Sequence, residues 1–328
     1  MVTKRKSGTN GKGRTQDQNY EVITNEIIQA IEYAIENNKL TPWDSPNTPV
    51  KGGLFPHNAE SLRAYTGFNV FILRMKQAIN QYPTAQWLTF QQIQKYGGDV
   101  KGQQSTPIAY WDFKRYEDKD ENGEVIATRV IPRLYIHRLF NVAQATGLKL
   151  PEAKELQKLT EFDPIAEAEK IIKNFKNKPK IFHDTADDRY FQPSTDEIHL
   201  PPRKAFKSAH RYYKTVFHEL THSTGHKSRL NRWENDDMKA KHFGDEAYSK
   251  EELVAEFGAS FLCMESGIDS TEVRKNSIAY LRGWLRALKN DKKLALQAAS
   301  KAQRSTNYIL GRKTEDVKPS AKTKTATK

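Results

Sequence analysis

The stretch from Thr215 to His226, TVFHELTHSTGH, holds the residues best suited to chemistry. It contains the H-E-x-x-H pattern of zinc-dependent hydrolases, with its two histidines at His218 and His222. Histidines four residues apart share one face of a helix, so their ring nitrogens can reach a single metal ion. Glu219 follows the first histidine and can reach a metal-bound water without being a ligand itself. The pattern therefore predicts a helix that carries two metal ligands and one catalytic carboxylate.

A zinc site that does chemistry needs a third protein ligand, which leaves the fourth position open for water. One extension of the pattern places a third histidine at position 228, but this chain has Ser228 there, so that subclass is excluded. The stretch EELVAEF, about thirty residues downstream, supplies Glu251, Glu252 and Glu256. Glu252 and Glu256 lie four residues apart, on one helix face, so one can bind metal while the other orients a histidine. We predict Glu252 as the ligand, and Glu256 as the orienting residue or the replacement ligand.

Glu252 also fits a second interpretation. Ser249-Lys250-Glu251-Glu252 is a capping box, in which Glu252 occupies the third helical position and bonds back to the helix terminus. If the helix begins at Ser249, Glu252 is a capping residue and Glu256 takes its place as the third ligand. The two interpretations differ in where the helix starts.

The expected chemistry is hydrolysis of a peptide bond. Zinc, or another divalent metal such as Mn²⁺, lowers the pKa of bound water from about 15.7 toward ~7. Glu219 would accept a proton from that water and pass it to the leaving amine. Residues 196–200 are expected to form an edge strand that holds an extended peptide by main-chain hydrogen bonds. The oxyanion needs a donor, for which Tyr190, His226 and Tyr248 are candidates that the sequence does not rank.

The positive charge of the chain is concentrated at its two ends. The formal net charge is +13, yet residues 1–14 carry five basic and no acidic residues, and residues 312–328 carry six basic and two acidic ones. Only +4 is left for the roughly 300 residues between them. Both ends are low in complexity and rich in Gly, Ser, Thr and Lys, so we predict disordered basic tails suited to salt-sensitive contact with a polyanion, or to solubility alone.

Composition also limits the class of protein. A chain of 328 residues is long enough for two domains, each with its own core. Cys263 is the only cysteine, which excludes internal disulfides and cysteine-based zinc sites. No apolar run approaches the ~20 residues that span a bilayer, and the basic N-terminus lacks the apolar core of a secretory signal. We therefore expect a cytoplasmic protein without membrane contact.

The pattern of apolar residues and turns predicts an α+β fold of two domains. The segments are a tail over residues 1–19, a first domain over 20–147, a linker over 148–162, a second domain over 163–311, and a tail over 312–328. In the first domain we expect helices over 21–37, 68–82 and 90–96, a strand over 87–90, and a hairpin with strands 107–116 and 129–142. In the second we expect helices over 163–177, 206–223, 249–266, 270–290 and 291–310, and strands over 180–183, 190–192 and 196–200.

Aromatic residues alternate with basic ones in the first domain. Side chains of this kind suit unpaired bases, because stacking contributes ~1–3 kcal/mol per base without reading sequence. Most of these aromatics would equally serve as core in any α+β domain. The residues we predict to bind DNA are Trp43, Arg63, Arg74, Trp87, Lys101, Tyr110, Trp111 and Lys114.

The chain resembles the ArdC-type antirestriction proteins of conjugative plasmids and mobile elements. The first domain carries the resemblance in the stretches AYTGFNVFIL, WLTFQQIQKYGGDVKG and TPIAYWDF. The second domain carries it in DEIHLPP, YYKTVFHELTHSTGH and YSKEELVAEFGASFL. The resemblance implies a first domain that binds single-stranded DNA and a zincin-like second domain of the gluzincin type. It also places metal-binding positions at His218, His222 and a glutamate of EELVAE, and the catalytic position at Glu219.

This resemblance implies protection of incoming plasmid DNA from host restriction, with single-stranded DNA and a still unidentified protein substrate as partners. Two other functions remain open at this stage. The protein could act by binding DNA alone, with a structural or vestigial metal site. Alternatively, the peptidase could cleave a repressor that is associated with DNA.

Overall fold

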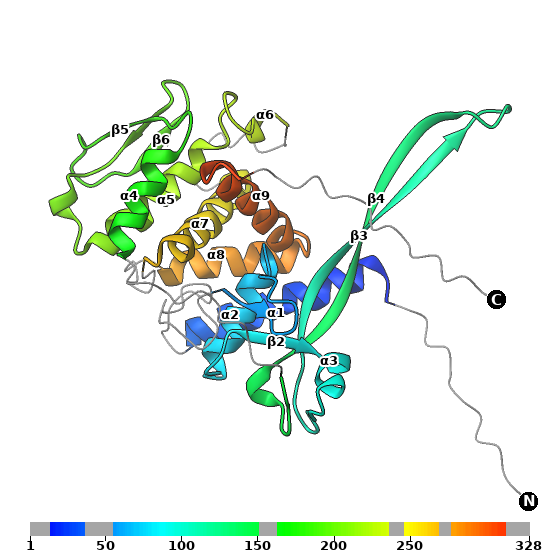
Figure 1. Cartoon of the computed structure of the whole chain (residues 1–328). Coiled ribbons are helices and arrows are strands. Elements are labelled where there is room, and N and C mark those ends of the chain that lie inside the picture. Colours follow the sequence, from blue (N-terminus) through cyan, green and yellow to red (C-terminus); the bar gives the residue numbers. More distant parts are fainter. Residues whose placement is uncertain (1–13, 37–54, 151–162, 236–245, 269–276, 313–328) are drawn as a thin grey trace, which may run out of the picture.

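The computed structural model describes residues 14–36, 55–150, 163–235, 246–268 and 277–312. Its first half combines helices with a four-stranded sheet, and its second half is a helical body that carries a three-stranded sheet (Figure 1). The predicted α+β class with two domains is confirmed. Among the described residues, no helix is long and apolar enough to cross a membrane.

The four-stranded sheet has the strand order β1-β2-β4-β3. Its strands are β1 (His57–Asn58), β2 (Gln86–Thr89), β3 (Thr106–Lys119) and β4 (Val125–Asn141). β1 and β2 are parallel, whereas β4 pairs antiparallel with both β2 and β3. The last two strands are longer than predicted, and together they project from the body as a two-stranded hairpin (Figure 1).

The described part of the first half also has three helices and a short 3₁₀ turn: α1 (Gln16–Glu36), α2 (Phe68–Ile79), α3 (Phe90–Lys95) and η1 (Val142–Gln144). α3 begins with a capping box in which Thr89 accepts from the backbone N–H of Gln92 while the Gln92 side chain bonds back to Thr89. α1 begins at Gln16, inside the segment predicted as a tail, and extends nearly to the predicted end.

The second half contains the remaining elements. They are α4 (Pro164–Asn174), β5 (Lys180–Phe182), β6 (Tyr190–Gln192), β7 (Glu197–His199), η2 (Arg203–Ala205), α5 (Ala209–Ser223), α6 (Arg232–Asn235), α7 (Glu246–Ser266), α8 (Ser277–Asn290) and α9 (Leu294–Ile309). Asp163 caps α4 by accepting from the N–H groups of Ile165 and Ala166, with Pro164 at the first helical position, as predicted.

The three-stranded sheet has the order β5-β7-β6, with β5 parallel and β6 antiparallel to β7. The hairpin of β6 and β7 is confirmed, but the prediction that residues 196–200 form an edge strand is wrong. β7 lies in the middle of the sheet, because β5 pairs with its other side. An extended peptide that adds to this sheet would have to pair with β5 or β6 instead.

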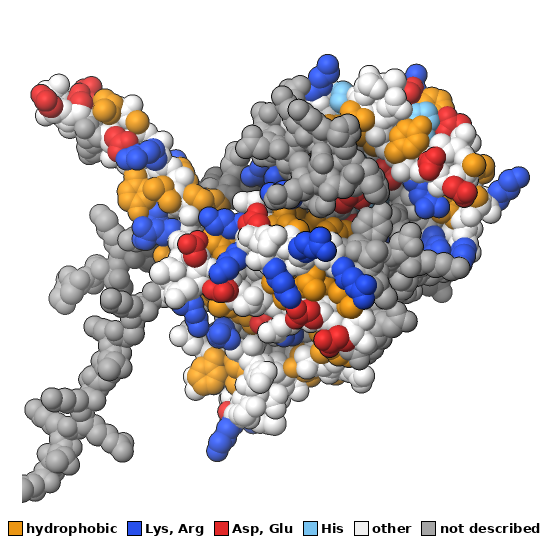
Figure 2. Space-filling view, turned by 180° about the vertical axis from the view of Figure 1, so that it is seen from behind, with side chains coloured by type: hydrophobic (Ala, Val, Ile, Leu, Met, Phe, Trp, Pro, Cys, Tyr) orange, Lys and Arg blue, Asp and Glu red, His pale blue; other side chains and the backbone are white. Residues whose placement is uncertain are grey.

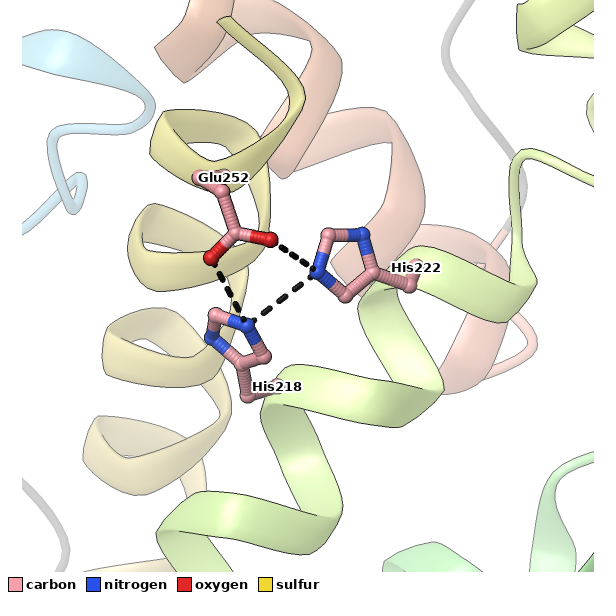
Figure 3. Close-up of side chains that lie close together, drawn as sticks. All are labelled: His218, His222 and Glu252. Atoms are coloured by element: carbon pink, nitrogen blue, oxygen red, sulfur yellow. Dashed lines mark hydrogen bonds and ion pairs between the residues drawn. The ribbon is translucent and has the colours of Figure 1, made fainter. Parts of the chain in front are cut away.

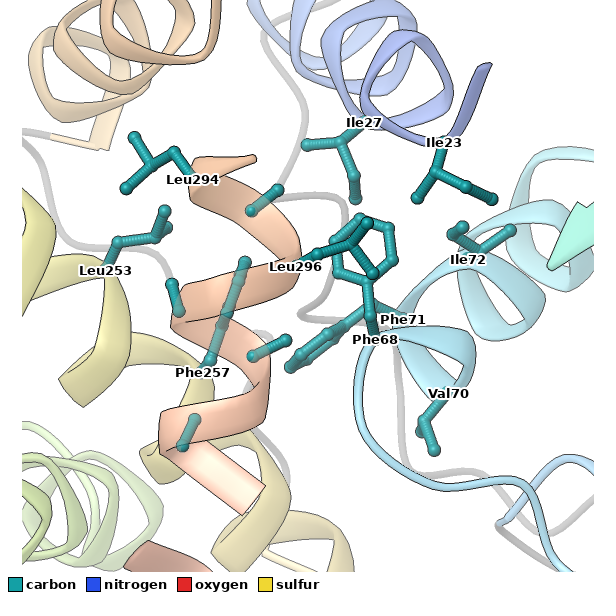
Figure 4. Close-up of a cluster of buried hydrophobic side chains, with 14 of the residues drawn as sticks. Ile23, Ile27, Phe68, Val70, Phe71, Ile72, Leu253, Phe257, Leu294 and Leu296 are labelled. Carbon is teal, nitrogen blue, oxygen red and sulfur yellow. The ribbon is translucent and has the colours of Figure 1, made fainter. Parts of the chain in front are cut away.

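The two halves share one hydrophobic core (Figure 4). Ile27 of α1 and Phe71 of α2 belong to the same cluster of buried residues as Leu253 and Phe257 of α7. The ring of Phe71 lies 4.4 Å from that of Phe257, centroid to centroid. The expectation that each domain buries a core of its own is therefore incomplete: the helices of the two domains also stabilise one another.

The predicted linker over 148–162 is described only at its start. Leu148 and Leu150 pack against the first-domain cluster that contains Leu88 and Ile93, so this start belongs to the first domain. The rest of the predicted linker, and most of both predicted tails, lie outside the described residues.

Candidate metal centre

α5 carries the two histidines, and its sequence explains why it forms and which face it buries. Ser208 caps the helix by accepting from the N–H of Arg211 at 3.2 Å. Tyr212, Val216 and Leu220 recur every four residues and are buried in the core of the second half. The helix begins at Ala209, three residues later than predicted, since a 3₁₀ turn and the cap precede it.

α7 packs closely on α5 because it has a glycine at the crossing point. A Cβ atom at Gly258 would lie 2.5 Å from Oγ1 of Thr221 on α5, closer than real Cβ atoms approach other groups. Thr221 is fully buried, and its hydroxyl donates to the Phe217 carbonyl at 2.8 Å, so it has little freedom to move away. Gly258 thus allows α7 to place its glutamates beside the histidines.

Replacing Gly258 by alanine should lower the free energy of unfolding by about 1–3 kcal/mol, because the new methyl group overpacks a filled interface. The variant should also bind metal more weakly, since α7 must move away from α5. Gly283→Ala on α8 is the matched control, because a Cβ there meets nothing within 4 Å. That control should be neutral or slightly stabilising. Urea unfolding and metal titration of both variants test the prediction, and equal behaviour of the two would contradict it.

His218, His222 and Glu252 converge on one point between α5 and α7 (Figure 3). The two Nε2 atoms lie 3.1 Å apart. Glu252 Oε2 is 3.5 Å from Nε2 of His218, and Oε1 is 3.2 Å from Nε2 of His222. One ligand atom from each residue lies within 4.8 Å of the others. The three side chains therefore point the nitrogens and oxygens that can bind metal at a common centre.

The far side of each imidazole is also held by a carboxylate. Nδ1 of His218 is 3.4 Å from Glu256 Oε1, and Nδ1 of His222 is 3.3 Å from Glu251 Oε1. An Nδ1–H that donates to a carboxylate fixes the tautomer in which Nε2 is free to bind metal. Glu256 thus lies beside the first histidine, and Glu251 has the same position beside the second.

Glu251 is itself fixed by a buried arginine. Arg232 donates to both carboxylate oxygens of Glu251, through Nε at 3.1 Å and through Nη2. It also donates to the Thr221 carbonyl at 3.2 Å, to the Thr224 hydroxyl at 2.7 Å and to the Ser305 hydroxyl at 3.2 Å. The arginine is 6% exposed and Glu251 is 7% exposed. A single side chain thus connects the end of α5, the start of α7 and α9.

The glutamates give the centre a strongly negative potential. Burial lowers the pKa of His218, but Glu252 and Glu256 together raise it to about 9. Burial also lowers the pKa of His222, yet Glu251, Glu252 and Glu219 raise it well above the ordinary value. The pKa of Glu252 is lowered despite its burial, because both histidines lie beside it. The cluster therefore favours a cation, either two protons on the histidines or a metal ion in their place.

The donor set fits a divalent metal of the zinc type. Two imidazole nitrogens and one carboxylate oxygen are the protein ligands of catalytic zinc sites that keep one open position. The histidine ring nitrogens opposite the centre face carboxylates, as metal-binding histidines require. Glu219, the neighbour of His218, is 4% exposed and adds its charge to the potential at His222.

Replacing Glu252 by alanine should lower the affinity for Zn²⁺ or Mn²⁺ by at least about 10- to 100-fold. Removal of a residue that only orients a metal ligand already causes a loss of that size. Glu265→Ala is the matched control, because Glu265 lies on the same helix but pairs with Arg312 at the surface. Metal content after dialysis and titration calorimetry measure the difference. Retention of metal by Glu252→Ala together with its loss in Glu256→Ala would transfer the ligand role to Glu256.

The structure decides between the two interpretations of Glu252. α7 begins at Glu246, so Ser249 is inside the helix and does not cap it. The capping-box alternative is wrong, and the side chain of Glu252 points at the histidines (Figure 3).

Two of the three candidates for the oxyanion donor make contacts elsewhere. Tyr190 stacks on His199 at 5.0 Å, on the sheet face opposite to Phe191, which packs with the residues of α5. His226 has its Nδ1 engaged 2.8 Å from the hydroxyl of Ser228. The side chain of Tyr248 lies outside the part that the structure describes.

The residues predicted to bind DNA fall into several groups. Trp43 lies outside the described residues. Two assignments are corrected: Trp87 is fully buried and Arg74 is 6% exposed, so neither can present itself to a nucleic acid. Trp111 is partly buried against Tyr20, with ring centroids 6.1 Å apart. Among the rest, Arg63, Lys101 and Tyr110 are exposed and Lys114 is half-buried, and of these only Tyr110 and Lys114 share one strand.

Sequence reasoning missed two groups of residues. Arg232 was missed because nothing in its local sequence marks it as buried, and its partners lie on α5, α7 and α9. The β4 side chains on the same strand face as Tyr110 were also missed. The aromatic and basic residues along 129–137 recur with a period of two, and this pattern could have revealed a shared face.

Comparison with known proteins agrees with the site and the fold. The model of the N-terminal domain of anti-restriction factor ArdC matches residues 17–142, and that of a zincin-like metallopeptidase matches residues 166–301. The metal-free crystal structure of the antirestriction protein ArdC from the R388 plasmid is 34% identical, with a TM-score of 0.65. The similarity covers 88% of this chain and 96% of that one. The chain belongs to the ArdC antirestriction family.

Other ArdC relatives extend the comparison. The Mn(II)-bound crystal structure of the same plasmid protein matches with 32% identity and a TM-score of 0.65 over 89% of this chain and 97% of its own. The uncharacterized protein y4eC of Sinorhizobium fredii is 30% identical over 88% of this chain and 91% of its own length. Two Escherichia coli proteins named DNA primase TraC are 32% and 34% identical, but the chain spans only 20% and 27% of their lengths. The resemblance stated from the sequence is confirmed.

Proposed function

We propose that this ArdC-family chain binds single-stranded DNA through its first domain and hydrolyses peptide bonds through its second. The observation that carries the peptidase is the convergence of His218, His222 and Glu252 next to Glu219. A Mn(II)-bound structure of a relative at 32% identity supports a divalent metal at this centre. Zn²⁺ remains our proposal for the metal, because its usual ligands match this donor set.

The residues of the chain divide the work of hydrolysis. When bound, the metal supplies a Lewis acid that polarises a peptide carbonyl and makes a nucleophile available at neutral pH. Glu219 accepts a proton from the attacking water and donates it to the leaving amine. Glu251 and Glu256 hold the two imidazoles in the orientation that faces the centre. The arrangement serves acid–base chemistry rather than nucleophilic attack by the protein.

The first domain supplies the proposed DNA-binding half. Its exposed residues include both aromatic and basic side chains, among them Tyr110, Arg63 and Lys101. The positive charge concentrated at the two ends of the chain favours a polyanionic partner in addition. We infer that DNA binding brings the peptidase to incoming plasmid strands, where it cleaves a protein that would otherwise lead to restriction.

Plasmid transfer into a restricting host tests the joint role. Wild-type protein should raise transfer efficiency, and Glu219→Gln should reduce it to the level found without the protein. Glu265→Gln, which changes a half-buried glutamate of α7 that pairs with Arg312, is the control and should behave as wild type. If Glu219→Gln protects as well as wild type while it keeps its metal, the protein acts by DNA binding and the metal site is structural.

Proteomics of the same cells identifies the substrate class. Wild-type protein should deplete a component of the restriction machinery, and Glu219→Gln should leave it intact. If a DNA-associated repressor is depleted instead, the peptidase controls transcription and not restriction.

A further inference from the structure

We propose that one face of the β3–β4 hairpin is the surface on which unpaired bases stack. The inference rests on the proposed single-stranded DNA binding and gives it a location. Cross-strand pairing defines this face, since residues directly opposite one another on two strands point to the same side. We call it the tyrosine face; its cross-strand pairs are Tyr110 with Tyr135, Asp112 with Arg133, Lys114 with Ile131, and Tyr116 with Arg129, and His137 follows Tyr135 on β4.

The aromatic side chains of the tyrosine face are open to solvent. Tyr110 is 46% exposed, Tyr135 is 39% exposed and Tyr116 is 38% exposed. An antiparallel ribbon of this kind normally turns such large apolar groups toward a core. Here three tyrosines on one face stay at the surface of a hairpin that projects from the body (Figure 1). Their exposure indicates a binding surface rather than a packing surface.

Neighbouring side chains hold these rings in place. The rings of Tyr110 and His137 lie 4.7 Å apart, centroid to centroid. Arg133 donates to the hydroxyl of Tyr116 at 3.3 Å, across the two strands. Rings that are already oriented lose less conformational entropy when a base stacks on them.

The opposite face of the same ribbon is covered near the body. Trp111 contacts Tyr20 of α1, and the main chain of Leu134 is bonded by the side chains of Gln16 and Asn19. Leu134 is itself fully buried. α1 therefore occupies one side of the hairpin base, and no described element covers the tyrosine face there.

Charge divides the hairpin into two parts. Beside the tyrosines stand three basic residues and one acidic one: Lys114, Arg129, Arg133 and Asp112. The basic side chains can contact phosphates, and Arg129 also pairs with Asp118 at 2.7 Å. Beyond them the hairpin tip is acidic, with Glu117, Asp118, Asp120, Glu121 and Glu124. The space-filling view shows this change from blue and orange near the body to red at the tip (Figure 2). A nucleic acid would be attracted to the tyrosine face and repelled by the tip, so the strand lies across the base of the hairpin.

The ligand that fits this surface is single-stranded DNA. Stacking needs the flat face of a base, which a duplex hides inside its own stack. Successive rows of side chains on one face lie roughly 7 Å apart along a strand. The rows of Arg133 and Lys114 lie between the row of Tyr110 and the row of Tyr116, so cations stand between rings. Rings and cations placed in this way can serve bases and phosphates without reading sequence.

The test uses the full-length protein and a fluorescent oligothymidine at two salt concentrations. The double variant Tyr110→Ala/Tyr135→Ala should bind at least about ten-fold more weakly than wild type. Tyr110→Phe/Tyr135→Phe should bind like wild type, because it keeps both rings, and it guards against loss of folding in the alanine variant. Val130→Ala, at an exposed residue opposite Arg115 on the other face, is the matched control and should have no effect.

Other outcomes overturn the inference in distinguishable ways. If wild type binds the oligonucleotide and the alanine variant binds equally well, the DNA-binding function stands and its location on the tyrosine face is wrong. Loss of binding in the phenylalanine variant would mean that the hydroxyl groups, not stacked rings, carry the contact. If wild type does not bind single strands in preference to duplex, both this inference and the proposed DNA binding fail.

Discussion

Glu219→Gln should lower the rate of peptide hydrolysis by about 10²- to 10⁴-fold, the usual contribution of a general acid–base residue. Glutamine has nearly the same shape as glutamate but cannot accept the proton of an attacking water. Glu219 is not among the residues that converge on the metal centre, so the variant should keep its metal. The loss should therefore appear in kcat, with little change in metal content or in the free energy of unfolding.

The measurement compares turnover of a peptide library by the two proteins loaded with equal metal. Glu265→Gln serves as the control. It makes the same substitution on α7, the helix of Glu252, at a glutamate that pairs with Arg312 and does not face the centre. Loss of metal from Glu219→Gln would show that Glu219 contributes to binding. Unchanged turnover in a protein that keeps its metal would remove Glu219 from the mechanism.

The metal centre could be predicted almost completely because its parts obey local rules. His218 and His222 follow from helical spacing, and Glu252 follows from the need for a third ligand on a second helix. The start of α7 could not be predicted, since capping signals compete at the end of a helix, and this error kept the capping alternative open for Glu252. The contact through Gly258 depends on how two helices cross, which no local pattern encodes.

Candidate DNA-binding residues are harder to predict, because aromatic composition does not distinguish core from surface. Trp87 and Tyr110 both stand on strands of one sheet, yet Trp87 lies under its neighbours and Tyr110 on an open ribbon. That difference arises from the length of the β3–β4 hairpin, which extends beyond the other described elements (Figure 1). Shared burial of Phe71 and Phe257 likewise joins residues far apart in sequence, so the common core of the two domains was not predicted.

Arg232→Met should lower the free energy of unfolding by about 3–5 kcal/mol, because it removes the arginine partner of the buried Glu251 and leaves only His222, among the described residues, beside that carboxylate. Burial alone raises the pKa of Glu251, but Arg232 and His222 lower it to about 2. A carboxyl whose pKa is depressed on folding stabilises the protein above its ordinary pKa and loses that contribution as the pH falls toward the folded value. The difference between wild type and Arg232→Met should therefore be full at neutral pH and should shrink below about pH 4.5. Urea unfolding at several pH values measures it.

A double-mutant cycle separates the two roles of this pair. Glu251→Leu/Arg232→Met removes both buried charges, so it should be more stable than Arg232→Met alone. The double variant still lacks the carboxylate that holds Nδ1 of His222, and its affinity for metal should stay about 10- to 100-fold below wild type. If stability and metal affinity recovered together, Arg232 and Glu251 would matter only for packing. Recovery of stability without recovery of metal affinity would show that the pair orients His222, which makes the buried arginine part of the metal centre although it contacts no ligand directly.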